Sequence, residues 1–265
     1  MSAQPSTADD DYTDFSEGIR RFCSIDLLQY KRGQMERRIR TFAATRGHAD
    51  LVAYLAVLRG DKIELEGFLN RVTINVSQLW RHPEQWDVLE RDVLPELGAA
   101  GRIRAWSAGC SYGAEAFTLA AVALSTVPTA RVTITGVDID ERMIDKARSA
   151  QFSAADARTT PPGVMERWFR KLPDGTYEAR PELRAITRFE VGDLLRVRPR
   201  PGAYDLVMCR NTVIYFNDDV RDALHARLAQ ALRPGGYLII GATERVSTPQ
   251  DIGLTPTHPF TYRKS

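Results

Sequence analysis

From residue 102 onward, short apolar runs alternate with longer segments of helical periodicity. The runs are RIRAWSA (102–108), RVTITGVD (131–138), AYDLVMC (203–209) and GYLIIGA (236–242). They are continuous and rich in β-branched residues, as in strands that are buried on both faces of a sheet. The helical segments between them cover 114–126, 140–149 and 217–232. This alternation predicts an α/β fold with a doubly wound, mostly parallel sheet.

Two parts of this region do not follow the alternation. The last run, THPFTYRK (257–264), suits an added antiparallel edge strand. Residues from about 151 to 190 contain Asp174-Gly175 between short alternating runs, a pattern typical of a β-hairpin. We therefore expect a small β insertion at about 151–190 within the sheet domain.

The preceding part of the chain, residues 14–95, has helical periodicity throughout. Met35, Ile39 and Phe42, for example, recur at the spacing of one helix face. Residues 1–13 are small, polar and acidic, so we expect a flexible tail there. The expected domains are thus the tail, an all-helical N-terminal domain at 14–95, and the sheet domain at 96–265.

Composition narrows the classes of function. The formal net charge of the 265 residues is +2, so no general electrostatic attraction to nucleic acid is expected. The three cysteines and four histidines lack metal-ligand spacing, and no metal is predicted. The start of the chain lacks the pattern of a signal peptide, and its most apolar run, 116–127, is too short to cross a bilayer. We expect a cytoplasmic monomer that does not insert into a membrane.

Polar side chains follow four predicted strands. In chain order, Gly109 and Glu115 follow the run 102–108, Asp138 ends the run 131–138, and Asp193 lies at the end of a third strand in VGDLL (191–195). Arg210 and Asn211 follow the run 203–209, which is then the fourth strand. Ligands of open α/β sheets bind beyond the carboxyl ends of the strands. Asp138 follows Gly109 by 29 residues, a place where nucleoside-binding folds carry the acid that binds ribose hydroxyls. The glycine spacings that hold phosphates are absent.

Two carboxylates near one pocket favour a particular cofactor. Glu115 and Asp138 would repel a phosphate but suit a neutral ribose beside a cation. S-adenosylmethionine combines a nucleoside with a positive sulfonium, and the glycine turn allows its close approach. Each residue alone also has an ordinary explanation, because Glu115 suits the first turn of a helix and Asp138 suits a helix cap. Their order along the chain favours the cofactor site.

Five blocks of sequence then resemble the chemotaxis receptor methyltransferases (CheR), over about residues 15 to 264. They are TINVSQLWR (73–81), WSAGCSYGAEAF (106–117), VDID (137–140), CRNTVIYF (209–216) and RPGGYLIIGATE (233–244), with LLQYKRGQMERRIR (27–40) similar to the family's basic N-terminal helix. The resemblance implies a Rossmann-like S-adenosylmethionine-dependent methyltransferase with product S-adenosylhomocysteine. It also implies a β insertion, which in some members docks on a receptor tail.

The resemblance assigns roles to individual residues. It implies cofactor contacts for Asn75, Ser77, Arg81, Glu115, Asp138, Asp193, Leu194, Arg210 and Asn211. Tyr215 matches a tyrosine at the methyl-transfer site, and Arg81 and Tyr215 are the catalytic candidates for orienting the substrate carboxylate. Tyr112 and Ala114 depart from the family's Thr and Glu, and the bulk of Tyr112 is expected to affect cofactor affinity.

The expected reaction esterifies glutamate side chains in the acidic helical cytoplasmic region of a chemoreceptor. Arg37, Arg38 and Arg40 are candidates for docking that acidic surface, although a solvated basic helix face also explains them. A nucleic-acid methyltransferase is disfavoured because the loop after the fourth strand reads CRNTVIYF rather than Asn/Asp-Pro-Pro-Tyr. A non-catalytic protein that binds S-adenosylmethionine or S-adenosylhomocysteine for signalling remains the alternative.

Overall fold

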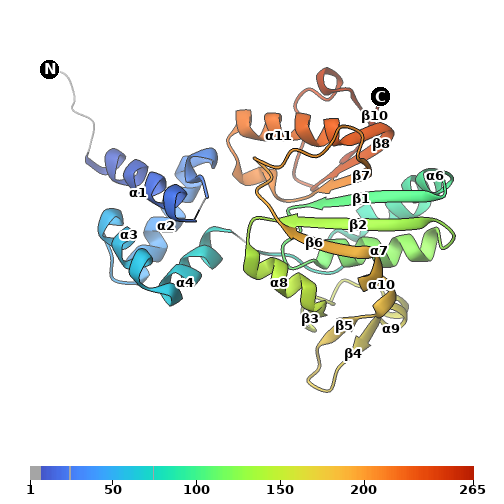
Figure 1. Cartoon of the computed structure of the whole chain (residues 1–265), viewed down its shortest axis with the longest axis horizontal. Coiled ribbons are helices and arrows are strands. Elements are labelled where there is room, and N and C mark those ends of the chain that lie inside the picture. Colours follow the sequence, from blue (N-terminus) through green and yellow to red (C-terminus); the bar gives the residue numbers. More distant parts are fainter. Residues whose placement is uncertain (1–6, 24, 74) are drawn as a thin grey trace. The chain divides into compact units, whose positions relative to one another are not determined.

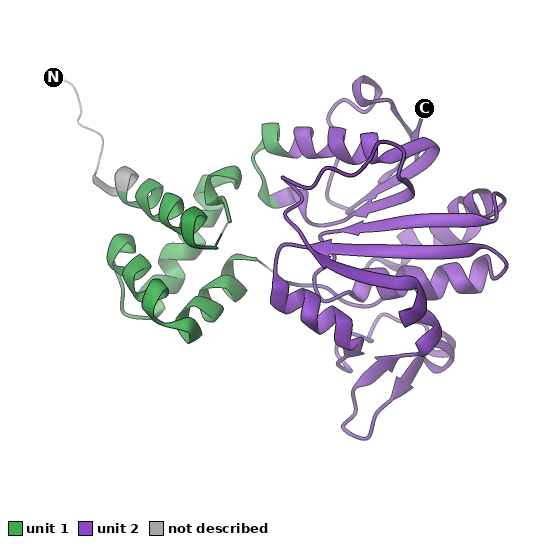
Figure 2. Cartoon of the chain, in the orientation of Figure 1, with its two compact units in different colours: residues 1–74, 215–220 green, residues 75–214, 221–265 purple. Residues whose placement is uncertain are grey.

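The computed structural model describes residues 7–23, 25–73 and 75–265. By their internal contacts these residues form two compact units (Figure 2). The helical unit comprises residues 1–74 and 215–220, and the sheet unit comprises 75–214 and 221–265. The division therefore falls at residue 74 and not at the expected residue 95. Residues 83–98 join the sheet unit because Trp86, Leu89 and Val93 are buried in its core cluster.

The helical unit is built from amphipathic helices around an aromatic core. Its elements are α1 (Thr7–Cys23), η1 (Leu27–Gln29), α2 (Arg32–Thr45), α3 (Leu51–Gly60) and α4 (Lys62–Val72). The rings of Phe15, Tyr54 and Phe68 pack together with centroids 5.8 to 6.4 Å apart. The expectation of a flexible tail over residues 1–13 is wrong for residues 7–13, which begin α1; residues 1–6 lie outside the described residues. Tyr12 is fully buried at helical spacing from Phe15, which explains why α1 starts early.

The sheet unit contains a seven-stranded sheet of order β6-β2-β1-β7-β8-β10-β9 (Figure 1). Its strands are β1 (Arg102–Ala108), β2 (Arg131–Asp138), β6 (Thr187–Val191), β7 (Tyr204–Cys209), β8 (Leu232–Ile240), β9 (Leu254–His258) and β10 (Thr261–Lys264). The first five strands in this sheet are parallel, and β10 pairs antiparallel with both β8 and β9. The predicted α/β class is confirmed. The C-terminal run supplies an antiparallel strand as expected, but β9 and not β10 forms the edge.

The crossover helices cover both faces of the sheet. They are α7 (Ala114–Thr126), α8 (Glu141–Ser149) and α11 (Asp218–Ala231). Strand order runs one way from β1 to β2 and β6, and the other way from β7 to β8. Because such crossovers are right-handed, α7 and α11 lie on opposite faces, as Figure 1 shows. The order reverses between β1 and β7, which is where doubly wound sheets bind their ligands.

The segment before β1 is one helical rod with a local irregularity. It consists of α5 (Pro83–Val88), a π-helical stretch η2 (Leu89–Val93) and α6 (Leu94–Gly98). The helix does not end at Pro95 but continues to Gly98. Proline lacks an N–H and its ring clashes with the preceding turn, and the wider π turn relieves this conflict.

The β insertion is a separate three-stranded sheet of order β3-β5-β4. Its elements are β3 (Gln151–Phe152), α9 (Pro162–Trp168), β4 (Phe169–Lys171), β5 (Tyr177–Ala179) and the following α10 (Pro181–Ile186). The predicted hairpin at Asp174-Gly175 is present, with Gly175 at φ 85°. The insertion ends before residue 187, and not near 190, because β6 pairs with β2 in the main sheet.

Candidate functional site

The turn after β1 has left-handed backbone conformations that bring it close to the turn after β7. Gly109 has φ 81°, and a Cβ there would clash with Thr212 on the turn after β7. The N–H groups of Gly109 and Cys110 donate to the carbonyl of Val137 at 2.8 and 3.0 Å. Ser111 adopts φ 47°, which costs a non-glycine residue about 1 kcal/mol. The two turns at the switch point therefore approach each other as closely as glycine permits.

Asp138 organises this turn from the end of β2. One carboxylate oxygen accepts the Ser111 N–H at 2.8 Å and the other accepts the Asp140 N–H at 3.0 Å. Burial raises the pKa of Asp138, and the backbone N–H groups oppose that rise. These backbone N–H groups do not use all the acceptor sites of the carboxylate, so Asp138 can still accept from a hydroxyl. It is the cap of no helix; Asp140 is the residue that caps α8.

Asn75 joins the same network from the segment before α5. Its amide nitrogen donates to Asp140 at 3.0 Å, and its carbonyl oxygen accepts from the Ser111 hydroxyl at 3.4 Å. Asp140 also forms an ion pair with Arg142 at 2.6 Å. The VDID motif pointed to this strand end, but the structural role of Asp140 was not predicted.

Glu115 and Arg210 form a buried pair at the switch point. Glu115 accepts the Ser107 hydroxyl at 2.7 Å, and Arg210 Nη1 lies 3.4 Å from its other oxygen. Burial raises the pKa of Glu115 and lowers the pKa of Arg210, while their mutual attraction opposes both shifts. Arg210 also donates to Gln85 at 2.8 Å and to the carbonyl of Arg81 at 2.6 Å. Most of its hydrogen-bonding capacity is therefore used within the protein.

Arg81 lies in a strained turn that Arg210 supports. Its neighbours Trp80 and His82 have φ 51° and 57°. The Arg81 carbonyl accepts from Arg210 and also from the Trp86 indole at 3.1 Å. The Arg81 guanidinium donates to the carbonyl of Val76 at 2.9 Å. Such strain persists only where the surrounding contacts hold it in place.

Glu244 fixes the turn after β7. Its carboxylate accepts the N–H groups of Gly241 at 2.6 Å, Asn211 at 2.9 Å and Val213 at 3.1 Å. Asn211 itself has φ 57°, and its side-chain Oδ1 is buried without a hydrogen-bond donor among the described residues. Glu244 was not predicted as a site residue, and its only signal was its place at the end of the GATE motif.

The remaining predicted contacts of the sheet unit serve local structure. Asp193 accepts the N–H of Leu195 at 2.8 Å and pairs with Arg196 at 3.3 Å. Leu194 is buried, and its carbonyl accepts from Arg227 at 2.5 Å. The Ser77 carbonyl is a partner of Tyr112.

Tyr112 links three segments of the sheet unit. Its hydroxyl bonds to the carbonyl of Ser77 and lies 2.9 Å from Oδ1 of Asp156. Its ring packs against Phe152 of the insertion, and the Lys146 ammonium lies 4.2 Å from its centroid. Burial and the neighbouring carboxylate raise the pKa of Tyr112. The extra bulk of this residue is thus largely buried in a hydrogen-bonded junction.

The other candidates belong to the helical unit. Arg38 stacks over the Tyr215 ring at 5.8 Å from its centroid, and its Nη1 is buried without an acceptor among the described residues. Burial lowers the pKa of Arg38, and the nearby positive charge of Arg71 lowers it further. Arg40 pairs with Glu36 at 2.9 Å and Asp11 at 3.1 Å, whereas Arg37 is exposed. The three arginines therefore differ in how much charge they offer a partner.

The donor set of the switch point fits S-adenosylmethionine. Asp138 and Glu115 are anionic groups beside a glycine turn, and the orphaned Oδ1 of Asn211 is an acceptor for an ammonium or hydroxyl group. No group of three or more potential metal ligands occurs in the described part of the chain. Likewise, none of the helices described is both long and apolar enough to cross a bilayer.

Known proteins resemble the chain over most of its length. Residues 10–73 match the family described as CheR methyltransferase, all-alpha domain, and residues 75–258 match its SAM binding domain. A chemotaxis protein methyltransferase of Listeria innocua is 33% identical over 257 residues, which cover 96% of this chain and 97% of that protein. Chemotaxis protein methyltransferase 1 of Pseudomonas aeruginosa is 29% identical, covering 93% of this chain and 94% of that protein.

Solved structures resemble the chain only at the level of the fold. An S-adenosylmethionine-dependent methyltransferase from Mesorhizobium loti is 20% identical with a TM-score of 0.33, over 55% of this chain and 51% of that one.

Proposed function

Because the chain belongs to the CheR methyltransferase family, we propose that it methylates glutamate side chains of a chemoreceptor's cytoplasmic region. It is a methyltransferase, and its cofactor is S-adenosylmethionine. The observation that most supports this proposal is the buried acidic site at the switch point, with an unfilled acceptor on Asn211. A phosphate-bearing cofactor would need an unpaired cation there, whereas the Arg210 guanidinium is paired with Glu115.

The cofactor residues divide by chemical type. Asp138 has the lone pairs to accept ribose hydroxyls, and the Asn211 amide oxygen is suited to an ammonium group. Glu115 supplies negative charge, which favours a cationic centre nearby. Asn75 and Ser111 hold the turn in shape through their mutual hydrogen bond. Asp193 and Leu194 are proposed neighbours of the adenine.

The chemistry asks little of acid–base catalysis. The bound cofactor supplies an electrophilic methyl group with a neutral thioether as leaving group. A substrate glutamate with a pKa near 4.3 is already ionised at neutral pH, so its oxygen attacks without a general base. The protein then needs only to orient and desolvate the reactants, which can contribute on the order of 7 to 11 kcal/mol.

The helical unit offers a carboxylate-recognition cluster of Arg38, Arg71 and Tyr215. Arg38 has a buried, unsatisfied N–H beside the Tyr215 ring, and Arg71 adds a second positive charge. Guanidinium groups bind carboxylates through charge-assisted hydrogen bonds. We propose that this cluster orients the substrate carboxylate. Arg81 of the sheet unit is proposed separately as a candidate for the same role. The exposed Arg37 suits steering of an acidic helical surface, while Arg40 is largely neutralised by Glu36 and Asp11.

The decisive experiment incubates the purified protein with methyl-labelled cofactor and a receptor cytoplasmic fragment. We expect label on the receptor that is released by base, as an ester is, and no label on a fragment whose acceptor glutamates are replaced by alanine. Saturable binding of S-adenosylhomocysteine without any transfer would favour a non-catalytic binding protein. We further propose that the protein acts as a cytoplasmic monomer, which sedimentation of the purified protein tests.

A further inference from the structure

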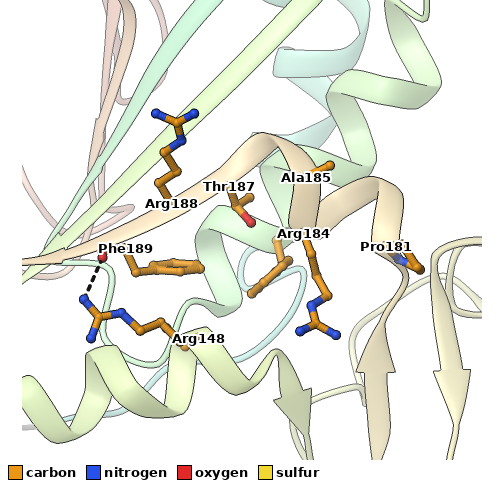
Figure 3. Close-up of a pocket in the computed structure, with 9 residues that line it drawn as sticks. Arg148, Pro181, Arg184, Ala185, Thr187, Arg188 and Phe189 are labelled. Atoms are coloured by element: carbon orange, nitrogen blue, oxygen red, sulfur yellow. Dashed lines mark hydrogen bonds between the residues drawn. The ribbon is translucent and has the colours of Figure 1, made fainter.

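The sheet unit has a cavity that the proposed reaction does not use. It lies behind the turn after β1 (residues 109–113), called the cofactor turn below. Its volume is about 560 Å³, which lies within the usual range for small-molecule sites. It lies between the end of α8, helix α10 and the edge strand β6 (Figure 3). Phe117 and Phe189 contribute an aromatic lining. The cavity therefore has room and a flat apolar surface for a ring-shaped group.

The lining is positively charged. The lining includes three arginines and no carboxylate side chain, and two of these arginines, Arg148 and Arg184, have their guanidinium groups on the cavity side of β6. Figure 3 shows Arg148 and Arg184 on either side of the Phe189 ring, whereas Arg188 leaves β6 on the opposite side. Arg148 bonds to the carbonyl of Phe189 at 3.1 Å, so one end of its guanidinium is anchored at the cavity.

Existing ion pairs leave these charges available. Arg148 pairs with Asp145 at 3.0 Å, and both side chains are about half exposed or more, at 52% and 66%. Arg184 is 3.7 Å from Glu178, too far for a strong hydrogen bond. Exposed pairs of this kind contribute little to stability, so the Arg184 guanidinium and the Nη1 end of Arg148 can exchange their present carboxylates for a stronger anionic partner.

The cavity wall is also the back of the cofactor turn. A Cβ placed on Gly113 would lie 3.0 Å from Phe189 and 3.0 Å from Ala147, both of which line the cavity. A Cβ on Gly136 of β2 would lie 2.7 Å from the same Phe189 ring. Gly113 directly precedes α7 and stands two residues from both Ser111 and Glu115. The Phe189 ring therefore packs directly against the backbone of Gly113 and Gly136.

We propose that this cavity binds a small organic anion with a flat apolar ring, held between Arg148 and Arg184 and stacked on Phe189. Its binding changes the affinity for the cofactor through Phe189 and Gly113. This second effect depends on the proposed cofactor site, whereas the binding of the anion does not.

The test uses 8-anilinonaphthalene-1-sulfonate, a fluorescent aromatic anion, titrated into the full-length protein. We expect one saturable site that R148Q/R184Q weakens about tenfold or more. R188Q is the matched control, because it removes an arginine that points away, and it should bind like the wild type. The neutral analogue N-phenyl-1-naphthylamine should bind more weakly than the sulfonate. A185F, which fills the exposed α10 wall without changing charge, should also abolish saturable binding.

Equal binding by the wild type and both R148Q/R184Q and A185F would overturn the site. The coupling is measured as the Kd for S-adenosylhomocysteine with and without saturating probe. Coupling between sites is reciprocal, so the same factor must appear in the Kd for the probe when the cofactor product is saturating. An unchanged Kd, with the arginine-dependent site present, would overturn the coupling alone. Failure of the proposed methyl transfer would leave the probe titration unaffected.

Discussion

His225 should make the sheet unit unstable in mildly acidic solution. The residue lies in α11 with an exposed fraction of 1%, and neither ring nitrogen has a hydrogen-bond partner among the described residues. Burial lowers its pKa from 6.5 to about 4. The folded state therefore keeps the imidazole neutral, while the unfolded chain binds a proton below pH 6.5. The stabilisation is complete above pH 6.5 and is lost as the pH falls from 6.5 towards 4.

The expected size follows from the two pKa values. Linkage gives a loss of about 2 kcal/mol in the free energy of unfolding between pH 7.5 and pH 5, and about 3 kcal/mol once both states are protonated. Urea unfolding followed by tryptophan fluorescence measures it, because Trp80, Trp86, Trp106 and Trp168 all belong to the sheet unit.

The comparison that isolates this effect uses H225L, which removes both unsatisfied nitrogens. The wild type should lose about 2 kcal/mol more than H225L between pH 7.5 and pH 5, because other titrating groups contribute to both proteins. H48Q, which removes a partly exposed histidine of the helical unit, is the control and should behave like the wild type. Equal losses in the wild type and H225L would show that His225 is not kept neutral, and the reasoning would fail.

Three further substitutions test the site. E244Q replaces an acceptor of three backbone N–H groups, so it should cost about 1 to 3 kcal/mol in urea unfolding and weaken S-adenosylhomocysteine binding measured by calorimetry. Y112F leaves the Asp156 carboxylate without its hydroxyl partner and should cost about 1 to 3 kcal/mol in the same unfolding assay; an unchanged midpoint would contradict the junction. R71Q should raise the KM for the receptor fragment without changing S-adenosylhomocysteine affinity. R59Q, at an exposed position in the last turn of α3, is the matched control and should leave both values unchanged.

Local sequence patterns were sufficient for several elements of the sheet, but β8 begins at Leu232 and not at the expected residue 236, and β9 was not predicted as a separate strand. The limits of the strands at 102–108 and 131–138 and of the helix at 114–126 agree with the structure, because each segment has a single period and a clear glycine or proline boundary. The sequence pattern did not show where α1 begins. Residues 7–13 are polar enough to be interpreted as a tail, yet Tyr12 gives them a buried face.

The contacts of the site could be predicted only in part. The order of Gly109, Glu115 and Asp138 located the switch point, because the end of each strand is visible in the sequence. The junction at Tyr112 was not predictable, since its partners lie 35 and 44 residues away and share no local pattern with it. Glu244 was missed for the same reason, because the N–H groups that it accepts are not distinguished by residue type.

The acidic residues of the site hold its turns, and the proposed cofactor contact would give Asp138 a second role that sequence cannot separate from the first. Asp138 and Glu244 are buried and accept backbone N–H groups from turns with left-handed residues, Ser111 and Asn211. Their negative charges thus fix the turns before any ligand arrives. This lowers the entropic cost of ordering the turns when a ligand binds. Removing Asp138 would therefore disturb the turn and the proposed ligand contact together. Loss of cofactor binding in such a variant consequently identifies a direct contact only if the turn keeps its conformation.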